Sequence, residues 1–134
     1  MDRIRANFNK QVFMRTLGAE LVSWEKGFAR IACDIAEQHL QQHGYAHAGI
    51  LASIADSACG YAALSTMPDD AEVMSVEFKI TLMRPCTANR IIADGRVLKT
   101  GRTLVFTEGA VNDANGSETY ATMTATMFCL RPVE

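Results

Sequence analysis

One acidic residue interrupts the most apolar stretch of the chain, and it is the leading candidate for chemistry. Apart from a few hydroxyl groups and Asp56, residues 48–64 are apolar or small. A helix that is apolar on every side belongs in a protein core. A carboxylate in that position is costly unless it is paired, hydrogen-bonded or neutral. Asp56 is therefore either part of a structural network or a carboxylate whose altered pKa serves a reaction.

Two polar residues precede Asp56 in the order Gln-x5-His-x8-Asp. They are Gln41 and His47, and a glycine-marked loop between them opens into the apolar helix. We expect the N–H groups of Ala48 and Gly49 to be unpaired donors of the first helical turn, where the helix dipole favours negative charge. Such donors can bind a developing oxyanion.

The distance between these groups sets a condition on any shared site. His47 and Asp56 are nine residues apart, which is about 13 Å along one helix. They cannot act on the same carbon from a single helix. If two chains laid their helices antiparallel, the start of one would lie near the middle of the other, and a two-fold dimer would hold two equivalent sites. The sequence therefore predicts an obligate homo-oligomer, either a dimer or a tetramer.

Length and composition are those of an ordinary globular protein. The 134 residues fit one domain, 1–134, with 49% hydrophobic and 21% charged residues. A net charge of −2 gives no reason to expect nucleic acid as a partner. Four separated cysteines without a CxxC pair favour a reducing cytoplasm over a redox or zinc motif. We expect no signal peptide and no membrane partner.

Periodicity predicts a helix, two strands, a long helix and four strands. Residues 3–15 have the pattern of an amphipathic helix with Ile4, Phe8, Val12 and Phe13 facing inward. An antiparallel sheet with one apolar face must be covered, and only the central helix is apolar enough to do so. The expected fold class is α+β, an antiparallel sheet wrapped around a long central helix. The expected strands are 18–23, 28–35, 72–82, 90–99, 103–113 and 119–130.

Strict alternation assigns the two faces of the strand 72–82. Its apolar face carries Val76, Phe78, Ile80 and Leu82. Ser75 falls on the opposite, polar face, where an exposed strand serine is the simplest interpretation.

The three histidines, His39, His43 and His47, follow one another at intervals of four. On a helix this would be a ladder of metal ligands. The glycine and glutamines among them predict a loop, in which the spacing has no such meaning. We therefore expect no metal, with His39 and His43 as solvated loop residues. His47 either fixes the turn or contacts a substrate carbonyl.

This central segment resembles the hotdog-fold thioesterases of the PaaI-like acyl-CoA group. Their pattern is a Gly-x-x-His-Gly-Gly turn followed by a helix with Leu-Ala-Asp or Leu-Ala-Glu. The chain has Gly-Tyr-Ala-His-Ala-Gly at 44–49 and Ile-Ala-Asp at 54–56. The resemblance covers nearly the whole chain beyond the first helix. Ala48 replaces a glycine but keeps the N–H that the family uses as oxyanion donor, while its methyl group could narrow the pocket.

The resemblance implies a hotdog fold that hydrolyses acyl-CoA thioesters to free acid and coenzyme A. Asp56 would be the general base on water or the nucleophile on the thioester carbonyl. The Ala48 N–H would stabilise the oxyanion. Gln41 and His47 of the opposite chain would orient the carbonyl or the water, and Ser75 would hold the water. No metal or redox cofactor is expected, since coenzyme A enters only as part of the substrate.

Several basic residues at strand ends could bind the phosphates of coenzyme A, although ordinary surface charge is an equally open interpretation. Arg102, in a Thr-Gly-Arg turn, resembles a recurrent feature of the family. Arg84 and Gly49 complete the expected substrate-binding set. A non-catalytic acyl-CoA binding or sensing module stays open as the alternative. A hotdog hydratase would require a histidine shortly after the acid, and no histidine follows Asp56.

Overall fold

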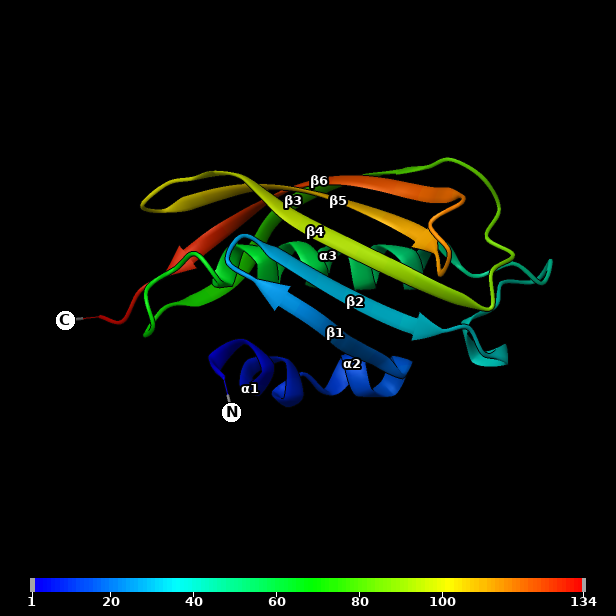
Figure 1. Ribbon diagram of the computed structural model, residues 1–134, viewed down its shortest axis with the longest axis horizontal. Helices are drawn as coiled ribbons and strands as arrows, with labels where there is room; N and C mark the ends of the chain where they lie inside the picture. Colours follow the sequence, from blue (N-terminus) through cyan, green and yellow to red (C-terminus); the bar gives the residue numbers. More distant parts are fainter. Residues whose placement is uncertain (1, 134) are drawn as a thin grey trace.

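The computed structural model describes residues 2–133 as one antiparallel sheet folded around a long helix (Figure 1). The strand order is β1-β2-β4-β5-β6-β3. This arrangement confirms the α+β class and the central helix. The elements are α1 (Arg3–Lys10), α2 (Val12–Leu17), β1 (Ala19–Glu25), β2 (Phe28–Asp34), the 3-10 turn η1 (Glu37–His39), α3 (Ala48–Leu64), β3 (Glu72–Leu82), β4 (Arg90–Thr100), β5 (Leu104–Asp113) and β6 (Thr119–Leu130).

Two glycines allow the sheet to approach α3 closely. A Cβ at Gly95 on β4 would lie 2.5 Å from the backbone of Ala58, and one at Gly109 on β5 would lie 3.0 Å from Cys59 Sγ. Side chains at these positions would push the layers apart. The backbone of α3 therefore packs directly against the middle of the sheet, which fixes the residues of α3 relative to the strands.

The first helix is broken, and the prediction of one continuous helix was wrong. Gln11 has extended backbone angles and separates α1 from α2. The two inward residues expected in α1 are buried, but Val12 and Phe13 are 63% and 53% exposed, and Met14 is buried instead. The break at Gln11 changes the helical phase, so the periodicity of α1 does not continue into α2.

A β-bulge in β3 interrupts the strict alternation expected of this strand at Val76. Ser75 pairs with Met127, but Glu77 already pairs with Thr126, so Val76 is the extra residue. Ser75 therefore lies on the inner face with the buried Met127, and its assignment to the polar outer face was wrong. The bulge turns the Ser75 side chain towards α3.

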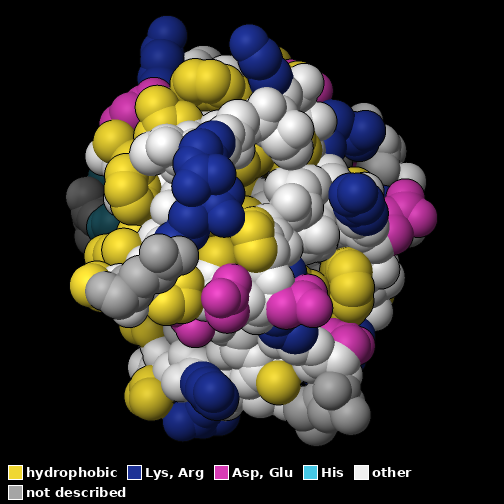
Figure 2. All heavy atoms as spheres, turned by 90° about the vertical axis from the view of Figure 1, so that its left-hand side faces the viewer, with side chains coloured by type: hydrophobic (Ala, Val, Ile, Leu, Met, Phe, Trp, Pro, Cys, Tyr) yellow, Lys and Arg dark blue, Asp and Glu magenta, His cyan; other side chains and the backbone are white. Residues whose placement is uncertain are grey.

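β3 also forms a free edge of the sheet. Figure 2 views the end of the molecule at which β3 begins, and hydrophobic side chains gather along one side of that face. A long edge strand with exposed apolar residues is a surface suited to pairing with another chain. The exposed apolar residues of β3 include Met74, Val76, Phe78 and Leu82.

We expect Gly95→Ala to lower the free energy of unfolding by about 1–3 kcal/mol, because its methyl group would overpack against the α3 backbone. Gly60→Ala is the matched control, since a Cβ there meets nothing within 4 Å and alanine is favoured within a helix. Urea unfolding at one fixed protein concentration measures both changes. Equal effects of the two substitutions would contradict the close packing of α3 on β4.

Candidate active site

α3 and β3 bring Asp56 and Ser75 together. Ser75 Oγ donates a hydrogen bond of 2.6 Å to Asp56 Oδ1. This contact requires the bulge at Val76, because without it Ser75 would face the other side of the sheet. The second carboxylate oxygen, Oδ2, has no hydrogen-bond partner among residues 2–133. The half-buried carboxyl group of Asp56 therefore has one oxygen held by the protein and one left for another molecule.

The surroundings of Asp56 change its proton affinity. Burial raises the pKa of Asp56 above its ordinary value, and the hydrogen bond from Ser75 opposes this shift only in part. The physical cause is that the apolar helix surface solvates the charged form poorly. A raised pKa makes the ionised carboxylate a stronger base, which is the property that proton abstraction near neutral pH requires.

His47 caps the start of α3 through its side chain. Its Nδ1 accepts a 2.8 Å hydrogen bond from the Gly49 N–H. The Gly49 N–H is therefore already paired, and the expectation that it would be a free donor was wrong. The Ala48 N–H has no hydrogen-bond partner within the described part of the chain. Because Nδ1 accepts, a neutral His47 ring carries its proton on Nε2, which can donate to another group.

The side chain of Gln41 is held by its own loop. Gln41 Oε1 accepts from the backbone N–H groups of His43, at 2.6 Å, and Tyr45, at 3.3 Å. Because only the amide oxygen can accept these two hydrogen bonds, Gln41 Nε2 is left available as a donor to another molecule. Gln41 and Ala48 line the same cleft, of about 540 Å³, at the start of α3. Its other walls include Leu51, Leu82, Met83, Arg84 and Pro85.

The predicted site residues thus form two half-sites in one chain. Gln41 and Ala48 line the cleft at the start of α3, with His47 between them in sequence, whereas Asp56 and Ser75 line a separate pocket of about 210 Å³. Positions 48 and 56 are separated by about 12 Å along the helix axis. One chain therefore does not bring its first-turn donor and its carboxylate to the same carbon.

His39 is a structural residue and was wrongly expected to be a solvated one. It is buried; its Nδ1 accepts from the Ala36 N–H at 2.9 Å, and its Nε2 lies 2.8 Å from the Leu17 carbonyl oxygen. His43 is exposed in the loop, as expected. The three histidines lie in η1, in a loop and at the start of α3, so they form no helical ladder. Within residues 2–133, no group of three or more His, Cys, Asp or Glu side chains could hold a metal.

The basic residues proposed for substrate binding lie at opposite ends of the molecule. Arg84 lines the cleft at the start of α3 and forms an exposed ion pair of 3.3 Å with Glu118. Arg102 lies at the turn between β4 and β5, at the end where α3 finishes (Figure 1). Arg90, another of the basic residues at strand ends, forms ion pairs with Glu20 on β1 and Asp34 on β2. Of these three, only Arg84 is next to the cleft of its own chain.

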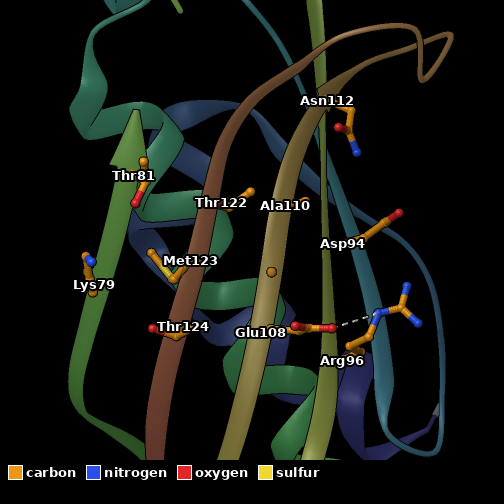
Figure 3. Close-up of a pocket in the computed structure, with 11 residues that line it drawn as sticks. Lys79, Thr81, Asp94, Arg96, Glu108, Ala110, Asn112, Thr122, Met123 and Thr124 are labelled. Atoms are coloured by element: carbon orange, nitrogen blue, oxygen red, sulfur yellow. Dashed lines mark ion pairs between the residues drawn. The ribbon is translucent and has the colours of Figure 1, made fainter. Parts of the chain in front are cut away.

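A further hollow, of about 530 Å³, lies on the outer face of the sheet, away from both half-sites. Figure 3 shows Lys79 and Thr81 of β3 on one side of it and the ion pair of Arg96 with Glu108 on the other. α3 covers the inner face, so Asp56 does not reach this hollow. Threonine and charged side chains dominate its lining, which is typical of a polar outer surface.

Four residues next to Asp56 were missed by the sequence analysis. Asn7, Gln11, Ser57 and Tyr61 line the Asp56 pocket from α1, from the helix break and from α3. The spacing of Asn7 and Gln11, four residues apart, places them on one face of a helix. That polar face was the available signal, but nothing in the sequence shows that it lies against α3.

Known proteins are similar to this chain in fold and in sequence. A family model described as the thioesterase superfamily matches residues 43–120. Acyl-coenzyme A thioesterase 13 of Homo sapiens is 34% identical over 84% of this chain and 82% of that protein. A thioesterase family protein of Silicibacter pomeroyi has a TM-score of 0.93 and 37% identity over 96% of each chain. The PaaI protein of E. coli, at 23% identity, TM-score 0.85 and coverage of 93% and 88%, supports the fold alone.

The chain therefore belongs to the thioesterase superfamily, and its fold is the hotdog fold. It is a thioester hydrolase, as the resemblance of its central segment implied. In the described part of the chain, no helix has both the length and the apolar character that a membrane crossing needs.

We expect the free energy of unfolding of Asp56→Asn to increase relative to that of the wild type as the pH rises. A raised pKa in the folded state means that the folded protein binds this proton more tightly than the unfolded chain does. The wild type therefore loses unfolding free energy from about pH 3.8, the ordinary pKa, up through the raised folded pKa. Asparagine does not titrate. Urea unfolding of both proteins across this window measures the difference, and a difference that does not change with pH would contradict the raised pKa.

Proposed function

We propose that the protein hydrolyses acyl-CoA thioesters at a site shared by two chains, with Asp56 as general base or nucleophile. The observation that carries this proposal is the half-buried Asp56 carboxylate, held by Ser75 at 2.6 Å through one oxygen, on the same helix whose first turn offers the free Ala48 N–H. The acyl-CoA substrate class follows the name of the human relative, acyl-coenzyme A thioesterase 13.

Each group has a defined role in the proposed reaction. The thioester oxygen accepts from the Ala48 N–H of one chain, where the helix dipole stabilises negative charge. Gln41 Nε2 and His47 Nε2 of the same chain donate to this oxygen or to the attacking water. Asp56 Oδ2 of the other chain takes a proton from the water that attacks the carbonyl carbon, or attacks that carbon itself. In the general-base route, the proton on Asp56 passes to the sulfur as the C–S bond breaks, which releases the free acid and coenzyme A as the thiol. In the nucleophilic route, the C–S bond breaks to leave an acyl–Asp56 anhydride and coenzyme A, whose sulfur takes a proton from water. A water molecule then hydrolyses the anhydride to the free acid and the Asp56 carboxylate.

Ser75 has a positioning role in this mechanism. Its hydrogen is committed to Asp56 Oδ1, so the reactive oxygen of the carboxylate is Oδ2. The lone pairs of Ser75 Oγ can still accept a hydrogen bond from the attacking water. The same serine thereby orients the carboxylate and helps to hold the water.

The surface of one chain supports a two-fold dimer of this kind. An axis opposite Ala52 pairs position 48 of one helix with position 56 of the other. The half-buried face of α3 carries the small residues Ala52 and Ser53 there, so two helices can approach closely. The free edge of β3 continues the sheet into the partner about the same axis. Exposed apolar residues on the outer face, such as Leu104 and Phe106, are available to join two dimers into a tetramer.

The remaining expectations fit this dimer. Arg84 and Arg102 bind the coenzyme A phosphates, and the exposed pair of Arg84 with Glu118 is weak enough to exchange. Gly49 leaves room for the His47 ring, since a Cβ there would lie 2.9 Å from its Nδ1. No metal or redox cofactor takes part. Residues 1–134 act as one domain, and the four buried free cysteines suit a reducing cytoplasm.

We expect Asp56→Asn to lower kcat by at least about 100-fold, the scale of losing a general base. Asparagine has nearly the same shape and still accepts the hydrogen bond from Ser75, so the fold should survive. Thiol release from a panel of acyl-CoA thioesters measures the effect. The control is Asp69→Asn, an exposed acid in the turn after α3.

A folded Asp56→Asn variant with near wild-type turnover would show that Asp56 is a structural residue and would contradict the proposed mechanism. Tight acyl-CoA binding by the wild type without thiol release would instead favour the non-catalytic binding or sensing module. This alternative is motivated by Ala48, which replaces a glycine of the family's pattern.

A further inference from the structure

The pocket that Asp56 and Ser75 line is a small polar chamber. It holds about 210 Å³ and is lined by residues of α1, α3 and β3 and by the helix break. This volume is below the roughly 300–1,000 Å³ of pockets for drug-sized ligands. Gly60 forms part of the lining without a side chain, which keeps the chamber open. The lining residues not yet placed in the site are Asn7, Gln11, Ser57, Tyr61 and Val73.

Hydrogen bonds connect the polar members of this lining into one chain. Gln11 Nε2 donates to Tyr61 Oη at 3.0 Å, and Tyr61 Oη donates to Asn7 Oδ1 at 3.0 Å. Ser57 Oγ donates to Gln11 Oε1 at 3.3 Å. Burial raises the pKa of Tyr61, so its phenol stays neutral. Asn7 Nδ2 donates to Glu72 Oε2 at 3.1 Å, so Asn7 presents its oxygen to Tyr61. Tyr61 must therefore donate to Asn7 and accept from Gln11, which fixes the direction of these hydrogen bonds.

This chain leaves one donor and one acceptor for a ligand. Gln11 Nε2 has two hydrogens and gives one to Tyr61; the second has no partner within residues 2–133. Ser57 Oγ gives its hydrogen to Gln11 and keeps lone pairs that can accept. A hydroxyl group placed between them would accept from Gln11 and donate to Ser57. A methyl group in that position would leave both unsatisfied, which costs free energy in a partly buried pocket.

The wall that carries Gln11 is anchored to the rest of the fold. Arg3 Nη2 donates to the carbonyl oxygens of Leu64, at 2.7 Å, and Met67, at 3.1 Å, where α3 ends. The ring of Phe8 packs edge-on against Tyr61, with 5.7 Å between centroids. Gln11 itself has extended backbone angles at the break between α1 and α2. These contacts hold the amide beside Asp56, so it acts as a fixed part of the pocket.

We infer that this chamber receives the acyl end of the substrate and selects short acyl groups that carry a hydroxyl near the thioester, with Gln11 as the residue that recognises it. The inference rests on the proposed thioester hydrolysis at Asp56. Once the carbonyl carbon lies at Asp56, coenzyme A occupies the cleft of the partner chain. The acyl group then extends away from that cleft into the chamber.

The test compares two acyl groups that differ only by hydroxyl in place of methyl, namely 3-hydroxybutyryl-CoA, as both enantiomers, and 3-methylbutyryl-CoA. We expect kcat/KM to favour one hydroxyl enantiomer by roughly tenfold, the scale of one well-placed hydrogen bond. Gln11→Leu should reduce this preference to about unity or reverse it. Gln38→Leu, at an exposed glutamine of η1, should leave it unchanged.

A second variant separates recognition from anchoring. Tyr61→Phe keeps the ring against Phe8 but removes the oxygen that holds Gln11, so the preference for the hydroxyl substrate over 3-methylbutyryl-CoA should fall. If Gln11 only anchors the N-terminal helices, Gln11→Leu will lower the thermal stability and both kcat/KM values together. Equal changes for the two substrates, or no preference in the wild type, overturn the inference.

Binding by the Asp56→Asn variant distinguishes this inference from the proposed function. Isothermal titration of the same thioesters into Asp56→Asn, with and without Gln11→Leu, measures recognition without turnover. Tighter binding of the hydroxyl substrate that depends on Gln11 supports the chamber even if the wild type releases no thiol, which would contradict only the hydrolysis. Thiol release with no difference in binding contradicts the chamber and leaves the hydrolysis standing.

Discussion

A carboxylate on an apolar helix is tolerated here because a hydroxyl group of the sheet reaches it. The 2.6 Å hydrogen bond from Ser75 to Asp56 depends on the bulge at Val76, which turns Ser75 inward. It also depends on the depth of α3 in the sheet, which Gly95 sets by leaving no side chain against the helix backbone. The bond opposes the effect of burial on the pKa of Asp56 only in part. The folded protein therefore keeps a carboxylate whose ionised form is poorly stabilised, which lowers the stability of the fold but favours a reaction in which Asp56 takes up a proton.

The length of the helix decides how this charge can be used. The free Ala48 N–H and the Asp56 carboxylate lie on one helix about 12 Å apart, each in its own hollow. The cleft beside Ala48 is mostly apolar and suits the arm of a long thioester, whereas the chamber beside Asp56 is small and polar. An antiparallel partner is the arrangement that we propose to unite them. The free β3 edge and the small residues on the half-buried face of α3 are the features that support it.

The sequence predicted the regular periodic patterns of single elements. It did not predict where these patterns are interrupted or which distant elements touch. The apolar helix, its lone acid and the strands were visible because each depends on local periodicity. Strand alternation failed at Val76, because neither glycine nor proline marks the bulge. Helical periodicity failed at Gln11, because neither residue type marks the break between α1 and α2. His39 was misjudged because its burial depends on the Leu17 carbonyl, which lies 22 positions earlier in the chain.

Subunit mixing tests the shared site most directly. Two inactive variants, Asp56→Asn and the double variant Gln41→Ala with His47→Ala, are mixed under conditions that allow exchange, with exchange confirmed by mass spectrometry. In a mixed dimer one site carries both defects and the other carries neither. Random pairing makes about half the dimers mixed, so activity should return to about one quarter of wild type. Confirmed exchange without any recovery would mean that each site is built within one chain, and would contradict the proposed dimer.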